Sequence, residues 1–209
     1  MEKRNHGLKC FAIILSAGLI CILLYLTYQC SVPYENLREN VFRLHILANS
    51  DDMGDQQLKL LVRDDILPLA KKLFDGMHVM AYDGETYAEK TANAAKSRIG
   101  ALQTAAQQSV YAHGSTQTAA VSVGYEAFPE KQYADLTMPA GDYWCLRIVL
   151  GSGKGHNWWC VLYPPLCLTP AAAKDCFEES ELAILQQPDR YRFRLAVVEW
   201  FQKWQQRQK

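Results

Sequence analysis

Residues 143–163, with the sequence YWCLRIVLGSGKGHNWWCVLY, decide the fold of this chain more than any other stretch. Two apolar runs, 143–150 and 157–163, flank a glycine-rich segment at 151–155, which is typical of two strands joined by a turn. We therefore expect these strands to pair directly with each other in an antiparallel sheet. Pro164 and Pro165 end the second strand, because proline cannot donate a backbone hydrogen bond.

The rest of the chain alternates strand and helix patterns around this pair. Alternating apolar positions predict a strand at 41–47 and weaker strands at 118–125 and 131–137. Apolar residues at helical spacing predict helices at 55–74, 84–111 and 191–206. This order favours a single α+β domain with an antiparallel sheet packed by helices.

The N-terminus carries the second strong signal. Residues 10–26 contain the uncharged run FAIILSAGLICILLYL, and Lys3, Arg4 and Lys9 precede it. As a helix this segment is about 25 Å long, near the lower limit for crossing a bilayer. The basic flank favours a cytoplasmic N-terminus and predicts export of the rest of the chain. We prefer an uncleaved signal anchor, then a cleaved signal peptide, then a buried core helix.

These signals divide the chain into three parts: a signal peptide or signal anchor at 1–30, a polar tether at 31–40, and an extracytoplasmic domain at 41–209. The formal net charge is zero, so the chain lacks the excess of basic residues that nucleic-acid binding needs. The apolar and charged fractions, 49% and 21%, indicate a folded rather than a disordered protein.

The chain has seven cysteines, and those beyond residue 29 would be external, where disulfides persist. Cys160 and Cys167 are the favoured pair, because the two prolines between them can turn the chain back. Cys145 with Cys160 is the rival pairing, and either pair needs Cα atoms within roughly 7 Å. No C-x-x-C or H-x-x-x-H spacing occurs, so we expect neither a metal nor a cofactor.

Two catalytic interpretations of residues 151–167 are weak. Lys154 follows a glycine, but the other residues of a phosphate-binding loop are absent. Cys160 with His156 or His45 could form a thiol–imidazole pair, in which the imidazole lowers the pKa of the thiol. No third residue that would orient the imidazole is evident, and a disulfide or buried cysteine is the preferred interpretation.

A second dense group of polar residues lies in RLHILANSDDMGDQQLKLLVRDDIL, residues 43–67. The acidic cluster at 51–55 lacks the spacing of a calcium loop, and helix capping explains it better. Arg43 and His45 lie on one face of their strand. A solvated face is the simpler interpretation, and a polar recognition patch is the more specific one.

Trp158 and Trp159 are neighbours on a strand, so they face opposite sides of the sheet. We expect one in the core, while the other packs under a helix or forms an exposed contact site. If Leu150 pairs with Asn157, Arg147 shares a face with Trp158 and a cation–π contact becomes possible.

The stretches RLHILANSDDMGDQQLKLLVRDDIL and PAGDYWCLRIVLGSGKGHNWWCVLYPPLC, residues 43–67 and 139–167, together resemble the stage II sporulation protein R family of endospore-forming bacteria. The hydrophobic segment near the N-terminus agrees with this family. The resemblance implies a signalling protein that is made in the forespore and exported into the space between the two membranes of the sporulating cell. There it would trigger a membrane-embedded aspartic protease, which removes the pro-sequence of a mother-cell sigma factor.

The resemblance and the residues together predict a non-enzymatic signal that acts by contact with this protease. We expect no small-molecule substrate, and contact with the membrane only through residues 10–26. The alternative is an exported thiol hydrolase acting on the cell wall, and a structural adaptor of the wall or membrane is a third possibility. The candidate contact residues come from the two matching stretches and are Arg43, His45, Asn49, Asp51, Arg147, His156, Asn157, Trp158 and Trp159.

Overall fold

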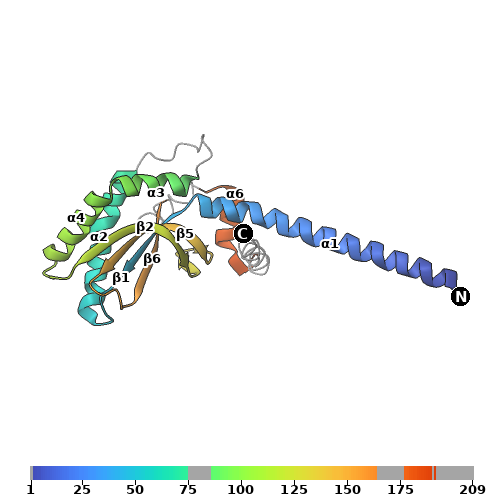
Figure 1. The fold of residues 1–209 in the computed structure, drawn as a ribbon, viewed down its shortest axis with the longest axis horizontal. Coiled ribbons are helices and arrows are strands. Elements are labelled where there is room, and N and C mark those ends of the chain that lie inside the picture. The colour runs from blue at the N-terminus through green and yellow to red at the C-terminus, as the bar shows by residue number, and fades with distance from the viewer. Residues whose placement is uncertain (1, 75–85, 164–176, 190, 192–209) are drawn as a thin grey trace.

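The computed structural model of the chain describes residues 2–74, 86–163, 177–189 and 191. Within them, a mixed β-sheet is covered by helices on one face, and a long N-terminal helix projects away from it (Figure 1). The α+β class predicted from the sequence is therefore confirmed. The purely antiparallel sheet is not, because one pair of central strands is parallel.

The sheet has four strands in the order β2-β5-β1-β6. These are β1 (Phe42–Leu47), β2 (Ala119–Phe128), β5 (Gly141–Leu150) and β6 (Asn157–Tyr163). β1 lies between β5 and β6, parallel to β5 and antiparallel to β6. The prediction that β5 and β6 pair directly with each other is therefore wrong. β1 is buried at every position from Phe42 to Ile46, which suits a central strand covered on both faces.

Three helices cover one face of the sheet: α2 (Met53–Phe74), α3 (Tyr87–Ser97) and α4 (Ile99–Ala112). Leu44, Ile46 and Ile148 point into the core beneath them. The predicted helix at 55–74 is confirmed, and Pro68 does not end it. The predicted helix at 84–111 is two helices, because Arg98, with φ −110° and ψ 13°, interrupts the helical backbone.

The other face is covered at one end by smaller elements: the hairpin β3 (Lys131–Tyr133) and β4 (Leu136–Met138), and the short helix α6 (Glu179–Gln186). The hairpin replaces the single strand predicted at 131–137, and α6 was not predicted. The helix expected at 191–206 lies outside the described residues, apart from Tyr191.

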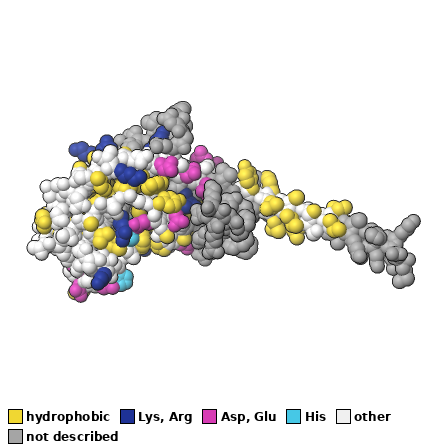
Figure 2. All heavy atoms as spheres, in the orientation of Figure 1, with side chains coloured by type: hydrophobic (Ala, Val, Ile, Leu, Met, Phe, Trp, Pro, Cys, Tyr) yellow, Lys and Arg dark blue, Asp and Glu magenta, His cyan; other side chains and the backbone are white. Residues whose placement is uncertain are grey.

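Helix α1 (Glu2–Glu39) joins the hydrophobic segment to the folded part without a break. Tyr34 and Leu37 are fully buried, and the Tyr34 hydroxyl donates a hydrogen bond of 2.8 Å to the Ala140 carbonyl. The end of the expected tether is therefore helical and packed. Farther out, Phe11, Leu15 and other apolar side chains of α1 are exposed (Figure 2). Among the described residues, no helix combines the length and apolarity needed to cross a bilayer, and the membrane contact of 10–26 stays a prediction.

Candidate functional site

The loop between β5 and β6 is bound to the end of β1 by hydrogen bonds. The Asn49 side-chain oxygen accepts from the Ser152 amide at 2.8 Å, and the Ser152 hydroxyl donates to the Asn49 carbonyl at 2.7 Å. The amides of Lys154 and Gly155 donate to the carbonyls of Asn49 and Ala48, at 3.1 and 2.9 Å. We name this the loop junction, and it unites the two stretches that the sequence analysis singled out.

Glycines make the loop junction possible. A Cβ atom at position 155 would lie 2.1 Å from the Ser50 carbonyl oxygen, far inside van der Waals contact. At position 151 the backbone has a positive φ of +54°, and a Cβ would lie 2.3 Å from the Asn49 side-chain oxygen. The run GSGKG is therefore explained by a close approach of two backbones and a left-handed turn.

His156 and Asp51 form the exposed tip of the loop junction. The Asp51 carboxylate accepts hydrogen bonds from the His156 amide, at 2.7 Å, and from the His156 ring nitrogen Nδ1. The hydrogen bond from the His156 side chain lowers the pKa of Asp51. Their side chains are 79% and 57% exposed, so this pair can meet a partner without a change in the core.

Asp55, in the first turn of α2, holds the segment after β1 in place by hydrogen bonds. Its carboxylate accepts hydrogen bonds from Ser50 Oγ at 2.6 Å, Asn49 Nδ2 at 2.8 Å and Gln117 Nε2 at 2.5 Å. These hydrogen bonds, that from Ser50 foremost, lower the pKa of Asp55. Within the described residues no group of acidic, histidine or cysteine side chains could hold a metal. Asp55 of this cluster orders the start of α2, where a negative charge is stabilising.

His45 lies on the face of the sheet that α2, α3 and α4 do not cover. Its Nδ1 donates to the Glu126 carboxylate at 2.8 Å, and its Nε2 lies 2.8 Å from the Asn157 side-chain oxygen. Its ring stacks on Trp159, with 3.8 Å between the centroids. Because both nitrogens are engaged and only 6% of the residue is exposed, His45 positions its neighbours instead of facing a partner directly.

Arg147, Asn157 and Trp159 surround His45 and are more accessible. The Arg147 side chain is 40% exposed, and its Nε lies 3.5 Å from the Glu126 carboxylate. Asn157 is exposed and Trp159 is half-buried. These three residues continue the surface from the loop junction across the sheet, since Asn157 is the first residue of β6 after the loop.

Arg43 is fully buried, contrary to the expectation of a polar contact residue. Its guanidinium lies 4.2 Å from the Phe128 ring centroid and 4.9 Å from that of Tyr143. It also donates a 2.9 Å hydrogen bond to the Tyr133 hydroxyl, which donates to the Trp159 carbonyl. The β3–β4 hairpin provides Tyr133 and so covers this end of the face. Arg43 is therefore a buried residue that holds Tyr133 beneath the surface formed by Arg147, Asn157 and Trp159.

Trp158 faces the helices, on the side opposite to Trp159, as strand alternation predicts. The guanidinium of Arg63 in α2 lies 4.4 Å from its ring centroid. The predicted contact of Trp158 with Arg147 is wrong, because β1 separates their strands and Trp158 lies opposite Ile46.

The cysteines of the sheet do not form a thiol–imidazole pair. Cys145 is a buried free thiol, so its predicted pairing with Cys160 is wrong. Burial and the neighbouring Glu126 carboxylate raise the pKa of Cys145 to about 12, which keeps it protonated. Cys160 is buried on the helix-covered face, away from His45. Cys167 lies outside the described residues, and its bond to Cys160 stays a prediction.

Two important residues, Glu126 and Gln117, were not identified from the sequence. The strand expected at 118–125 runs on to Phe128, which places Glu126 in the sheet beside His45. The alternation of Ser122, Gly124 and Glu126 between apolar residues is the signal that could have extended the prediction. Gln117 gives no comparable signal, because its contact with Asp55 joins segments far apart in the chain.

Comparison with known proteins gives a family match and a similar curated protein. The family model of stage II sporulation protein R matches residues 38–173. The stage II sporulation protein R of Bacillus subtilis (strain 168) is 34% identical over 143 residues, which are 68% of this chain and 60% of that protein. The match thus spans less than two thirds of the relative's length. No solved structure matches this chain.

Proposed function

This chain belongs to the stage II sporulation protein R family, and on that premise we propose that it is an intercellular signal of sporulation. It is exported from the forespore into the space between the two membranes of the sporulating cell. There it binds a membrane-embedded aspartic protease of the mother cell and favours the active state of that protease. The protease then processes a mother-cell pro-sigma factor. Binding can have this effect only if the active state is bound more tightly.

The loop junction is the observation that carries this proposal. Residues 48–51 and 151–156, distant in the chain, form one surface held by backbone hydrogen bonds. Its tip, Asp51 and His156, is exposed and polar, while Arg147, Asn157 and Trp159 extend it over the sheet. A rigid surface with an aromatic and an arginine side chain is the composition favoured at protein–protein contacts.

Helix α1 supports the export step. Its exposed side chains between Phe11 and Tyr25 are mainly apolar, and more than half of the surface of each large one is accessible. Such a continuous apolar surface requires a cover. Together with the basic residues that precede it, this surface favours a segment that the export machinery recognises.

The alternative, an exported thiol hydrolase, receives no comparable support. It needs the Cys160 thiol beside the imidazole of His156 or His45. His156 instead bonds Asp51 at the tip of the loop, and His45 is held between Glu126 and Asn157. Cys160 is buried on the opposite face of the sheet.

The test is complementation in sporulating cells that lack their own family member. The complete chain should restore conversion of the pro-sigma factor, followed by immunoblotting. His156→Ala should reduce conversion about fivefold or more, as expected for a central interface residue. His113→Ala is the matched control, because His113 also pairs with an aspartate, Asp65, at 3.0 Å, but lies on the helical side of the molecule.

Both substitutions remove exposed or part-exposed pairs that contribute little to stability, so both variants should unfold like the unchanged chain. Failure of the unchanged chain to restore conversion, while a C-terminal reporter shows that it is exported, would refute the signalling role. Equal activity of His156→Ala and His113→Ala would instead refute the placement of the contact at the loop junction.

A further inference from the structure

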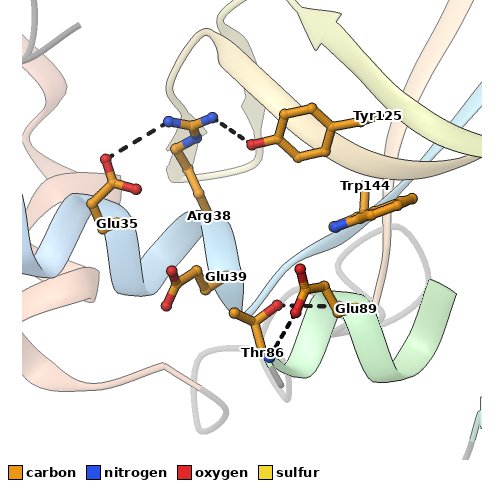
Figure 3. A pocket seen from close by; sticks show the side chains of 7 residues that line it. All are labelled: Glu35, Arg38, Glu39, Thr86, Glu89, Tyr125 and Trp144. Carbon is orange, nitrogen blue, oxygen red and sulfur yellow. Dashed lines mark hydrogen bonds and ion pairs between the residues drawn. The ribbon is translucent and has the colours of Figure 1, made fainter. Parts of the chain in front are cut away.

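A cavity of about 330 Å³ opens between α1, α3 and the strands β2 and β5 (Figure 3). It is lined by Glu35, Arg38 and Glu39 from the end of α1, by Thr86 and Glu89 from the start of α3, and by Tyr125 and Trp144 from the sheet. Its size is at the lower end of the range for ligand pockets, which suits a single side chain better than a larger ligand. It does not include any residue of the loop junction.

The lining carries more negative than positive charge. It has three carboxylates, those of Glu35, Glu39 and Glu89, and one guanidinium, that of Arg38. Arg38 is fixed at the rim, because it donates hydrogen bonds of 2.8 Å to the Tyr125 hydroxyl and to the Asp142 carbonyl. Glu89 is fixed as well, since one of its oxygens accepts from the Thr86 amide in the cap of α3.

The carboxylates are close enough to repel one another. Partial desolvation raises the pKa of Glu39, and the negative charges of Glu35 and Glu89 raise it further. A positive group placed among them would reverse this repulsion, because an opposite charge nearby stabilises the ionised carboxylates. Arg38 already forms an ion pair with Glu35, at 3.8 Å, and it partly offsets the rise in the pKa of Glu39. The pKa of Glu39 is raised nevertheless, so the remaining negative charge of Glu39 and Glu89 favours a cation.

Aromatic rings form the opposite wall. Tyr125 and Trp144 meet edge to face, with 5.6 Å between their centroids. The ammonium of Lys96 lies 4.4 Å from the Trp144 ring centroid, so this ring already attracts a cation of the same chain. Aromatic faces next to carboxylates bind ammonium and guanidinium groups through cation–π attraction combined with charge.

We propose that this cavity binds the alkylammonium or guanidinium group of a lysine or arginine side chain from a partner protein. The cavity offers carboxylates for the charge and the Trp144 and Tyr125 rings for the aliphatic stem. The features that favour a cation belong to residues that line the cavity. The binding of a cation to the cavity can therefore be tested without the protease.

The experiment uses the complete chain in a nonionic detergent, which brings no competing cation. The indole N–H signal of Trp144 is followed by NMR during titration with Nα-acetyl-lysine methylamide. Nα-acetyl-norleucine methylamide, which has nearly the same stem without the charge, is the control ligand. We expect saturable movement of the Trp144 signal with a Kd of about 1–10 mM for the lysine compound, and none for the norleucine compound. Equal responses to the two compounds would overturn the proposal.

Three variants test the residues involved. Glu39→Gln should weaken binding about threefold to tenfold, and this effect should fade as salt screens the charge. Glu179→Gln, an exposed carboxylate on α6 outside the cavity, should leave the Kd unchanged. Lys96→Met should tighten binding, because it removes a positive charge 4.4 Å from the Trp144 ring centroid, which repels a second cation at that ring.

Opposite effects of Glu39→Gln and Lys96→Met cannot arise from a general loss of structure. Unchanged affinity in both variants would overturn the assignment of the cavity. A free polyamine such as spermidine is the remaining source of an ammonium group. Spermidine binding at least a hundredfold tighter than the lysine compound would overturn the assignment to a protein side chain, and weaker binding would support it.

Discussion

Gly155→Ala should detach the β5–β6 loop from the end of β1. The added Cβ would lie 2.1 Å from the Ser50 carbonyl oxygen and 3.0 Å from the Ala48 Cβ, so the loop must move by about 1 Å or more to reach ordinary contact. Three hydrogen bonds depend on its present position, those from the amides of residues 154, 155 and 156.

Each of these hydrogen bonds contributes about 0.5–1.5 kcal/mol net, so their loss should lower the free energy of unfolding by about 2–4 kcal/mol. Urea unfolding followed by tryptophan fluorescence measures this change. With a typical slope of about 2 kcal/mol per molar urea, the midpoint should fall by about 1–2 M.

The matched control is Gly100→Ala, at an exposed position of α4 where an added Cβ meets nothing within 4 Å. This change should raise the free energy of unfolding by about 0.5–1 kcal/mol, because alanine is the better helix former. A Gly155→Ala protein within about 0.5 kcal/mol of the unchanged chain would refute the view that the close approach at Ser50 holds the two loops together.

Three further predictions concern the core and the titrating groups. Leu37→Ala should lower the free energy of unfolding by about 2–4 kcal/mol, because Leu37 is fully buried. Leu15→Ala, on the exposed part of α1, should change the free energy of unfolding by no more than about 0.5 kcal/mol. Equal effects of the two substitutions in urea unfolding would contradict the packing of α1 against the domain. The lowered pKa of Asp55 means that its carboxylate stabilises the fold above the unfolded-state pKa of about 4, and that this stabilisation is lost as the pH falls through the lower folded-state pKa. Asp55→Asn should therefore flatten the decline of stability below about pH 4, while Asp52→Asn should keep the steeper decline, and unfolding curves between pH 2 and 7 distinguish the two results. Burial and Glu126 raise the pKa of Cys145 to about 12. Cys145 should therefore react with iodoacetamide at about pH 8 only after unfolding. Peptide mass analysis that finds labelled Cys145 in the native protein would contradict this prediction.

Sequence patterns predicted most elements of this fold but not how they pair. The strands at 41–47 and 157–163 and the helix at 55–74 were recognised because alternation and helical spacing are local properties. The insertion of β1 between β5 and β6 is not local. It depends on strand pairing between residues about a hundred positions apart, such as Leu44 with Leu146 on one side and with Cys160 on the other.

The structure brings together the two stretches that carry the candidate contact residues, and it buries some of these residues that the sequence analysis treated as possible contacts. The two stretches at 43–67 and 139–167 meet, with Asn49, Asp51 and His156 at the loop junction, and the contact role of these residues stays a prediction. Arg43 and His45 share a face, as alternation requires, yet both are buried. Alternation shows which residues face the same way, but it does not show that a hairpin such as β3–β4 will cover them.

Helix α1 runs without a break from its apolar part to the buried Tyr34 and Leu37. The direction in which the folded domain faces is therefore fixed relative to the apolar part of the helix. Inserting one residue between 28 and 33 would turn the domain by about 100° about the helix axis, relative to the apolar part of the helix. Inserting seven residues would nearly restore the original orientation and would place the domain about 10 Å farther from the apolar part. A signal that must face its receptor in one direction should then lose activity with the first insertion and recover part of it with the second.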